Sequence, residues 1–440
     1  MFRRSTCAAL VALVSAALLA AAVPARASAA APPVEGWAGA DGGTVTGGAG
    51  ADTASVWTVR TRAELKEALA NHGDPTAPKV IRVAGAVAGA EAEDGSGRLL
   101  GEQDYAPGYD LGRYMSCFGP DGTTWSDTRY DYCKQQRTLR QTGSNNEKAQ
   151  IQLTVPSNTT VEGVPGTGAR LLGVFVTVNT GTNIVVRDLR LEAPVDHFTT
   201  WSPDDGDSGN WNARFDAMTV ITGSRVLVAH CTFTDGRYPD REAPVGFHGK
   251  PVQRHDGLLD IEDGSDYLTV ADSRFTDHDK ALLIGSGDGR GDRDRGHLKV
   301  TFARNWFQDI VQRSPRVRFG QVHSYNNYFT GAAPEYALGI GLESAIVSER
   351  NVFAYDRGAD PAVAVANYGG TRFRDTGSWF AGRRVDLNAV AAAEAPGEFS
   401  TDTGWDPATV PGYHHRTLPT ARSIEQYVRH QAGPRPPGRQ

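Results

Sequence analysis

Six segments of nine residues, all after residue 180, share one pattern. Each has apolar residues near its start and a large apolar residue at its end, and the segments are 183–191, 225–233, 267–275, 299–307, 321–329 and 345–353. Their end positions are separated by 42, 42, 32, 22 and 24 residues. The short intervals suit one coil of a parallel β-helix, and the long ones suit a coil that carries a loop. Each coil of such a solenoid buries its inward side chains only by stacking on its neighbours.

Three asparagines share a register within this repeat. Asn305, Asn327 and Asn351 each lie two residues before the end of their segment. The register predicts a stacked asparagine ladder at a turn, in which the amides satisfy one another's hydrogen bonds. A β-sandwich also has short strands, but it prefers alternating polar and apolar residues and hairpin turns, which are sparse here. The pattern therefore favours an all-β solenoid.

The segments outside the repeat have other patterns. Helical signals are confined to the ends: 61–70 begins with a capping box, in which a Thr cap is followed three residues later by Glu, and 421–431 has the pattern of a closing helix. We expect 88–150 to be a loop-rich excursion from a β-helix domain that spans 31–432. The Pro-, Gly- and Arg-rich segment 433–440 is expected to be disordered.

The first thirty residues have the pattern of a secretory signal peptide. Arg3 and Arg4 precede an apolar run over 7–23, and the sequence Ala-Arg-Ala at 25–27 follows as a cleavage site. The run is short for a membrane anchor, and no basic stop-transfer cluster follows it. We therefore expect residues 1–30 to be removed on export, a secreted, extracellular protein, and no membrane partner.

The charge of the exported chain limits its partners. Without residues 1–30 it has nine more Asp and Glu than Lys and Arg. An acidic protein is not an obvious nucleic-acid binder, so we expect no nucleic-acid partner. A polyanionic ligand would need a local basic patch or a metal ion. We expect the protein to be a monomer.

Three cysteines remain after export. Cys117 and Cys133 flank a loop rich in Gly, Asp and Tyr, and they are able to form a disulfide that would stabilise by about 3 kcal/mol. Cys231 lies in an apolar run, which favours a small buried hydrophobe over a nucleophile. No cysteine spacing typical of a zinc site is present.

Carboxylates are the first candidate functional group. Asp256 and Asp260 lie four residues apart, and Asp216 belongs to an earlier coil. Carboxylates without a cysteine or histidine cluster suit a hard ion such as Ca²⁺. On a straight strand the first two would lie about 13 Å apart, so Gly257 must allow a bend that leaves Asp256 in a loop and Asp260 on the strand. Any one pair of these aspartates, taken alone, is better explained as solvated turn residues.

Cations form the other two candidate groups. Lys280 follows Asp-His-Asp at 277–279, and taken alone a salt bridge to one of those aspartates explains it best. In the sequence Arg-Ser-Pro-Arg-Val-Arg at 313–318, the proline cannot donate to a sheet, so it marks a strand edge or turn. By alternation Arg316 and Arg318 share one face, with Arg313 beyond the proline. The local concentration of charge favours an anion site over a solvated face.

These residues resemble the ordered motifs of polysaccharide lyase family 1, the pectate lyases, in their bacterial, Bacillus-type secreted branch. The similarity runs from about Gly36 through most of the chain, and five motifs in the family's order carry it: Asp216, Val228-Ala229-His230-Cys231, His255-Asp256-Gly257-Leu258-Leu259-Asp260, Asp277-His278-Asp279-Lys280 and Arg313-x-Pro315-x-x-Arg318. The resemblance implies a right-handed single-stranded parallel β-helix with long loops and short terminal helices.

The resemblance also implies a role for each candidate residue. The calcium ligands of the family match Asp216, Asp256 and Asp260. The catalytic base matches Arg313, and the residues that hold the substrate carboxylate match Lys280 and Arg318, to which we add the neighbouring Arg316.

One position departs from the family. Where the family usually has Trp-Ile-Asp-His, residues 227–230 read Leu-Val-Ala-His, so Ala229 replaces an aspartate. The lost carboxylate matches no calcium ligand or base. We expect the change to affect stability or the shape of the site, and it leaves a non-catalytic protein as an alternative.

The implied reaction is calcium-dependent β-elimination of de-esterified α-1,4-polygalacturonate (pectate), which gives 4,5-unsaturated oligogalacturonides. Ca²⁺, Lys280 and Arg318 would neutralise the C6 carboxylate while the neighbouring C5 proton leaves. Arg313 would take that proton. Free guanidinium is protonated at neutral pH, so this base requires neighbouring positive charge and alkaline conditions.

Three alternatives share the fold. A pectin lyase acts on methyl-esterified pectin and has no need of calcium, so retention of the three aspartates argues against it. A polygalacturonase hydrolyses its substrate, and its Asn-Thr-Asp, Gly-His-Gly and Arg-Ile-Lys signatures are missing. A non-catalytic pectin-binding β-helix would bind polygalacturonate without forming an ultraviolet-absorbing product.

Overall fold

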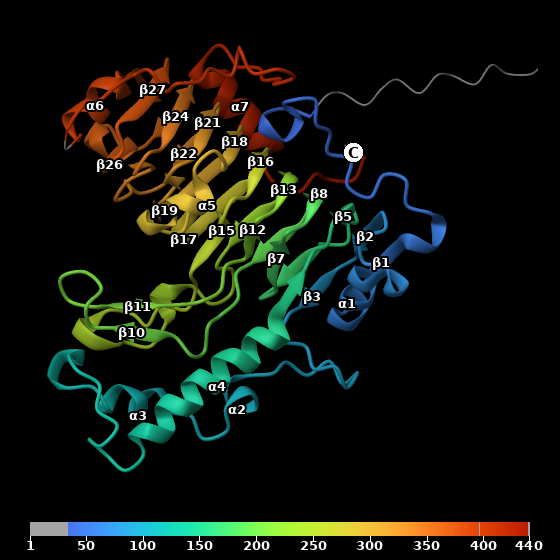
Figure 1. Cartoon of the computed structure of the whole chain (residues 1–440), viewed down its shortest axis with the longest axis vertical. Helices are drawn as coiled ribbons and strands as arrows, with labels where there is room; N and C mark the ends of the chain where they lie inside the picture. The colour runs from blue at the N-terminus through green and yellow to red at the C-terminus, as the bar shows by residue number, and fades with distance from the viewer. Residues whose placement is uncertain (1–33, 396, 439–440) are drawn as a thin grey trace, which may run out of the picture. The chain divides into compact units, whose positions relative to one another are not determined.

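The computed structural model describes residues 34–395 and 397–438. Strands of this part wind into a solenoid (Figure 1) and form a 10-stranded sheet and a 17-stranded sheet. The 17-stranded sheet consists of two parallel ladders joined through the long β17 (Arg274–Ile284), and these ladders are called sheet 2 and sheet 3 below. From β4 (Gln152–Thr154) onward, each coil adds one strand to each sheet, and equivalent strands of neighbouring coils pair in parallel. The expected parallel β-helix is confirmed. The signal-peptide prediction for 1–30 lies outside the described residues.

The three sheets are numbered here from their strands. Sheet 1 contains β1 (Val56–Val59), β2 (Lys79–Val83), β5 (Thr159–Gly163), β8 (Thr182–Arg187), β13 (Ser224–Ala229), β16 (Asp266–Ala271), β18 (Lys299–Ala303), β21 (Gln321–Tyr325), β24 (Ala345–Glu349) and β27 (Arg372–Thr376). Sheet 2 contains β4, β7 (Phe175–Asn179), β12 (Met218–Ile221), β15 (Gly257–Glu262), β17 (Arg274–Ile284), β20 (Arg316–Val317), β23 (Leu338–Gly341) and β26 (Val365–Tyr368). Sheet 3 contains β3 (Ala86–Ala88), β6 (Arg170–Leu172), β9 (Arg190–Glu192), β14 (Thr232–Thr234), the first part of β17, β19 (Trp306–Gln312), β22 (Tyr328–Thr330), β25 (Val352–Ala354) and β28 (Trp379–Phe380).

The large residues that end the repeated segments form a ladder along sheet 3. Leu191, Phe233, Phe275, Phe307, Phe329 and Phe353 are paired in register from coil to coil. Neighbouring phenyl rings are stacked nearly parallel, with centroids 4.5–5.2 Å apart. The six residues are at most 2% exposed. The repeat seen in the sequence is therefore the core of the solenoid.

The predicted asparagine ladder is present and fully buried. Asn305 Oδ1 accepts from the backbone N–H of Ser273, Asn327 Oδ1 from that of Asn305, and Asn351 Oδ1 from that of Asn327. Asn327 Nδ2 also donates to Asn351 Oδ1, 3.1 Å away. Most bonds of the ladder thus join a side chain to the backbone of the preceding coil, so the amides satisfy buried backbone groups at the turn.

The expectation that helices occur only at the ends is wrong. The excursion contains α2 (Glu102–Tyr105), α3 (Leu111–Ser116) and the nineteen-residue α4 (Cys133–Ile151). In Figure 1, α4 projects beside the hairpin of β10 (Thr200–Ser202) and β11 (Asn210–Asn212). A second hydrophobic core joins these parts: Tyr105, Ala106, Tyr109, Tyr114, Phe118, Phe198, Trp201, Trp211 and Val252.

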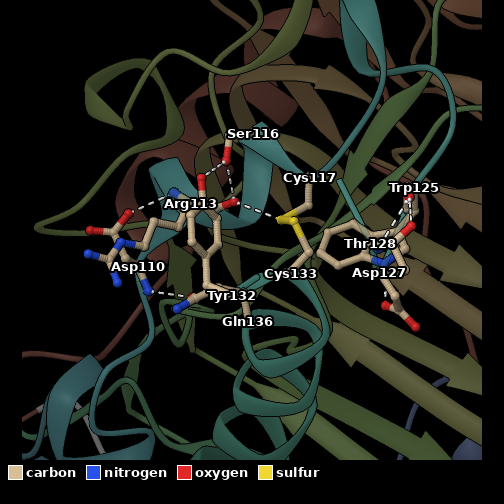
Figure 2. The surroundings of a disulfide bond; sticks show 11 residues. Asp110, Arg113, Ser116, Cys117, Trp125, Asp127, Thr128, Tyr132, Cys133 and Gln136 are labelled. Atoms are coloured by element: carbon tan, nitrogen blue, oxygen red, sulfur yellow. Dashed lines mark hydrogen bonds between the residues drawn. A yellow bond between two sulfur atoms is a disulfide. The ribbon is translucent and has the colours of Figure 1, made fainter. Parts of the chain in front are cut away.

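The disulfide that the sequence allowed is formed. Cys117, directly after α3, is bonded to Cys133, the first residue of α4 (Figure 2). Asp110 caps α3 by accepting from Arg113 N, and Gln136 of α4 accepts from Asp110 N. The bond therefore fixes the loop that precedes α4. Cys231 is a free, buried thiol, as predicted.

The terminal helices match the prediction. Helix α1 (Arg62–Ala70) has the expected capping box between Thr61 and Glu64, and α7 (Ala421–Gln431) packs against β22 and β25. The short α5 (Gly291–Asp294) and α6 (Leu387–Ala393) and the two-residue β29 (Arg383–Arg384) complete the described elements. Among the described residues, no helix has the length and apolar character needed to cross a membrane.

The final segment departs from its predicted disorder in the part that the structure describes. Gly433 N donates to Asp272 O, and the guanidinium of Arg435 forms two hydrogen bonds with the buried carboxylate of Asp188. A buried carboxylate requires a partner, and this arginine supplies it. The segment is therefore held against the solenoid as far as residue 435.

The phenylalanine ladder can be tested by truncation. Phe307→Ala removes a fully packed ring between two others and is expected to lower the free energy of unfolding by about 3–5 kcal/mol, measured by urea denaturation. Val311→Ala is the control, because Val311 is 47% exposed and its truncation should change stability by no more than about 0.5 kcal/mol. Equal effects of the two substitutions would contradict the ladder's role.

Candidate functional site

The site residues gather on the outer face of sheet 2. Thr219, Asp260, Leu283 and Arg316 pair successively in register across β12, β15, β17 and β20. Neighbouring strands lie about 4.8 Å apart. In this column the carboxylate of Asp260 and the guanidinium of Arg316 are two coils apart. Asp256 immediately precedes β15, and Asp216 lies two residues before the neighbouring β12.

Two carboxylates converge over Gly257. A methyl group at Gly257 would lie 2.7 Å from Asp260 Oδ1 and 2.8 Å from Asp216 Oδ1. Asp216 Oδ1 accepts from Gly257 N at 2.7 Å, and Asp260 Oδ1 accepts from Leu283 N at 3.1 Å. Both aspartates are 6% exposed. Because Gly257 has no side chain, a small space remains beside it. The buried carboxylates of Asp216 and Asp260 face this space.

Burial and mutual repulsion disfavour the charged forms of these carboxylates. Burial, and next the charge of Asp256, raise the pKa of Asp216 to about 7. Burial and the charges of Asp216 and Asp256 raise the pKa of Asp260 well above its usual value, while Arg313 acts in the opposite direction. The structure therefore brings Asp216 and Asp260 together, and Asp256 and Arg313 lie near enough to influence them, although the carboxylate oxygens of the three aspartates do not all lie within 4.8 Å of one another. Such a group fits a hard divalent cation.

Asp256 differs from the other two aspartates because it pairs with Lys280. The Lys280 Nζ lies 3.1 Å from Asp256 Oδ1 and 3.2 Å from Gln253 Oε1. The side chain of Asp256 is 36% exposed, and that of Lys280 is 14% exposed. The salt bridge to Asp277 or Asp279 that best explained Lys280 in isolation is not formed. Lys280 instead reaches the carboxylate cluster from the next coil.

Three arginines follow on the next coil. The turn 313–315 separates β19 from β20, as Pro315 predicted, and burial together with Arg318 and Arg313 lowers the pKa of Arg316. Arg313 and Arg316 have no carboxylate partner among the described residues, and the Nε atom of each is buried without a hydrogen bond. Arg318 pairs with Asp288 at 2.6 Å. The cluster therefore carries unneutralised positive charge.

Several residues around the site were not found from the sequence. Thr219 Oγ1 donates to Asp216 Oδ2, and Gln253 orients Lys280. The guanidinium of Arg316 lies over the ring of Tyr368, 4.2 Å from its centroid. Thr219 pairs in register with Asp260, so aligning the coils of the sequence could have identified it. Gln253 lies in a loop that has no repeat, so the sequence gives no signal for it.

Ala229 lies away from this cluster. It ends β13 of sheet 1, paired with Arg187 and Ala271 of the neighbouring coils. The aspartates and arginines are carried by sheet 2 and its turns. The replacement of the family's aspartate by Ala229 therefore changes sheet 1, and it removes no charge from the site on sheet 2.

The fold and sequence both match known proteins. A family model described as "Pectate lyase" matches residues 136–432. The chain is 34% identical to "Pectate lyase" of Bacillus subtilis (strain 168), over 91% of each chain. It is 34% identical to "Pectate lyase E" of Dickeya chrysanthemi, over 84% of this chain and 82% of the relative.

The chain belongs to the pectate lyase family. It is accordingly a polysaccharide lyase. A solved structure, "Pectate lyase bound to hexasaccharide", superimposes with a TM-score of 0.81 at 33% identity and covers 91% of this chain and 96% of that one. Its likeness agrees with the right-handed winding of the parallel β-helix.

The raised pKa values predict a pH-dependent stability in metal-free buffer. Because the folded protein holds protons on Asp216 and Asp260 more tightly than the unfolded chain, where Asp titrates near pH 3.9, stability must fall as pH rises from about 4 through about 7. Asp260→Asn removes one of the buried charges. We expect it to raise the free energy of unfolding above that range, because it removes the repulsion between this carboxylate and those of Asp216 and Asp256.

Urea denaturation in chelator across this pH range provides the measurement. At low pH, where Asp260 is protonated, the variant and the wild type should be similarly stable. If Asp260→Asn lowers stability equally at low and high pH, the carboxylate is not repelled by its neighbours, and the assigned arrangement is wrong.

Proposed function

We propose that this member of the family is a secreted enzyme that cleaves de-esterified α-1,4-polygalacturonate by calcium-dependent β-elimination. The products would be 4,5-unsaturated oligogalacturonides. The observation that carries the proposal is the opposition of charges on sheet 2. Buried aspartates there face a group of cations, two of which are arginines with no carboxylate partner in the part of the chain that the structure describes. A polyanion with a carboxylate on every sugar is the substrate class that such a surface fits.

The acidic side of the site supports Ca²⁺ as the cofactor. The donors are carboxylates of Asp216, Asp256 and Asp260, and oxygen ligands of this kind suit Ca²⁺. Bound Ca²⁺ would supply positive charge against the substrate carboxylate. Lys280 pairs with Asp256, and we infer that Lys280 turns toward the substrate when the aspartates hold the ion.

The cationic side supports carboxylate binding and proton removal. We assign the substrate carboxylate to Lys280, Arg318 and Arg316. Arg318 pairs with Asp288, which is 67% exposed, and such an exposed ion pair contributes little stability, so a substrate carboxylate can replace it. These cations lower the energy of the negative charge that develops when the C5 proton leaves.

Arg313 is assigned as the base that takes this proton. Its Nε is buried without a hydrogen-bond partner, and Arg316 lies beside it. Neighbouring positive charge favours the neutral form of a guanidinium, which is the form that can accept a proton. Loss of the C5 proton then breaks the C4–O bond and leaves an unsaturated sugar end.

Secretion is supported by the Cys117–Cys133 disulfide, because disulfides persist in oxidising compartments. The proposed signal peptide at 1–30 precedes the described residues, and the net negative charge of the chain is consistent with an exported enzyme that attracts its substrate only locally.

Removal of the proposed base is the direct test of the chemistry. Arg313→Ala is expected to lower kcat on polygalacturonate by about 10²–10⁴-fold, measured as the rise in ultraviolet absorbance of the unsaturated product. Arg422→Ala, an exposed arginine on α7, is the matched control and should be as active as wild type. An Arg313→Ala enzyme with wild-type kcat would remove Arg313 from the reaction.

Calcium dependence is tested by chelation. We expect a chelator to abolish the absorbance signal and Ca²⁺ to restore it, because the aspartates alone repel a polyanion. Asp260→Asn should require a higher Ca²⁺ concentration for half-maximal activity, by about tenfold or more. Activity that persists in chelator, and is greater on methyl-esterified pectin, would instead indicate a pectin lyase.

A further inference from the structure

A second group of ligating side chains lies on sheet 1, apart from the proposed catalytic residues of sheet 2. His323 of β21 and Glu349 of β24 face His415, which belongs to the C-terminal segment between α6 and α7. One ligand atom from each lies within 4.8 Å of the others. His323 is fully buried, whereas the side chains of Glu349 and His415 are 22% and 20% exposed.

The two imidazoles converge on one carboxylate oxygen. Glu349 Oε2 lies 3.1 Å from His323 Nε2 and 3.3 Å from His415 Nε2. The ring centroids of the two histidines are 5.0 Å apart and their planes are 81° from parallel. Ligand atoms around a tetrahedral Zn²⁺ with bonds of about 2.0–2.1 Å are separated by about 3.3 Å, so the two nitrogen–oxygen spacings match two edges of such a site.

The second nitrogen of His323 is oriented as in a metal site. His323 Nδ1 lies 2.8 Å from Tyr413 Oη, which in turn lies 2.7 Å from Thr301 Oγ1. A proton on Nδ1 can be donated to the tyrosine oxygen while the tyrosine hydroxyl donates to Thr301. This arrangement leaves the lone pair of Nε2 directed at the site, and such outer hydrogen bonds fix the tautomer of metal-binding histidines.

A second cluster of His and Asp residues has ligand atoms equally close together, but its histidine is unsuitable as a metal ligand. Asp235, Asp240 and His255 also lie within 4.8 Å of one another. However, both nitrogens of His255 face carbonyl oxygens, those of Pro194 and Tyr238, each at 2.8 Å. Both nitrogens of His255 are therefore directed at backbone carbonyl oxygens, and neither is directed at a metal position between the carboxylates. His323 and His415 have no such competing carbonyl on Nε2 among the described residues.

We propose that His323, Glu349 and His415 form a binding site for a divalent transition metal ion, with Zn²⁺ as the fitting ion. Two imidazole nitrogens and one carboxylate are a ligand set that suits Zn²⁺ and is unlike the oxygen-only group of Asp216, Asp256 and Asp260. The partial exposure of Glu349 and His415 leaves room for water as a fourth ligand. The ion would fasten the C-terminal segment to β21 and β24, and so stabilise the solenoid.

The test uses full-length exported protein that has been stripped of metals and then kept in excess Ca²⁺, so that the carboxylate cluster is occupied. Zn²⁺ is titrated by calorimetry, and Tm is measured with and without Zn²⁺. We expect wild type to bind one Zn²⁺ per chain and to gain Tm. His415→Ala and Glu349→Gln should bind at least about tenfold more weakly and gain no Tm.

The matched control is His414→Ala, because His414 is exposed and adjacent to His415 in the chain. It should bind Zn²⁺ as wild type does. Co²⁺ provides a readout of coordination: wild type should show the visible absorption of a four-coordinate nitrogen and oxygen site, and His415→Ala should lose it while retaining the wild-type circular dichroism spectrum. The proposal is overturned if wild type shows no such site, or if His414→Ala loses Zn²⁺ as His415→Ala does.

Discussion

The parallel register between neighbouring coils is the constraint on which the rest of the structure depends. Each strand pairs with its equivalents in the coils before and after it, so a residue's position in its own coil decides which side chains it meets. One column of this register carries the phenylalanines of the core, and another carries Thr219, Asp260, Leu283 and Arg316 on the outer face. A slip of one residue would bury the charged column and expose the rings. Stability and site geometry are thus set by the same pairing.

The register holds like charges close together. Asp216 and Asp260 remain buried near Asp256 even though their charges repel, and Arg316 lies beside Arg313 and Arg318. Backbone pairing between successive coils fixes the carboxylates and most of the cations in place. Neither group can therefore move apart to reduce the repulsion between its like charges. A cation for the aspartates and a carboxylate for the arginines would relieve both. This complementarity is the physical basis of the proposed function.

The sequence predicts the parts of this arrangement that repeat from coil to coil. The segment ends predicted the phenylalanine ladder, and the shared positions of Asn305, Asn327 and Asn351 predicted the buried amides. Helix α4 was missed because it has no apolar stripe and contains Gly143, a poor helix former. That glycine is required by a distant contact, since a Cβ there would lie 2.3 Å from the ring of Phe198. The bridge from Lys280 to Asp256 and the support from Gln253 were also missed. Lys280 pairs in register with Gly257, next to Asp256, but Gln253 and Asp256 lie in a loop before β15 that has no repeat.

The proposed function requires that the aspartates and the arginines act on the same sugar. A crystal structure of Arg313→Ala with Ca²⁺ and a short oligogalacturonate tests this most directly. The account predicts a Ca²⁺ ion held by Asp216, Asp256 and Asp260, a sugar carboxylate against Lys280 and Arg318, and the C5 atom of that sugar facing the space left by the Arg313 side chain. Ca²⁺ bound away from these aspartates, or an oligosaccharide whose C5 faces away from position 313, would contradict it.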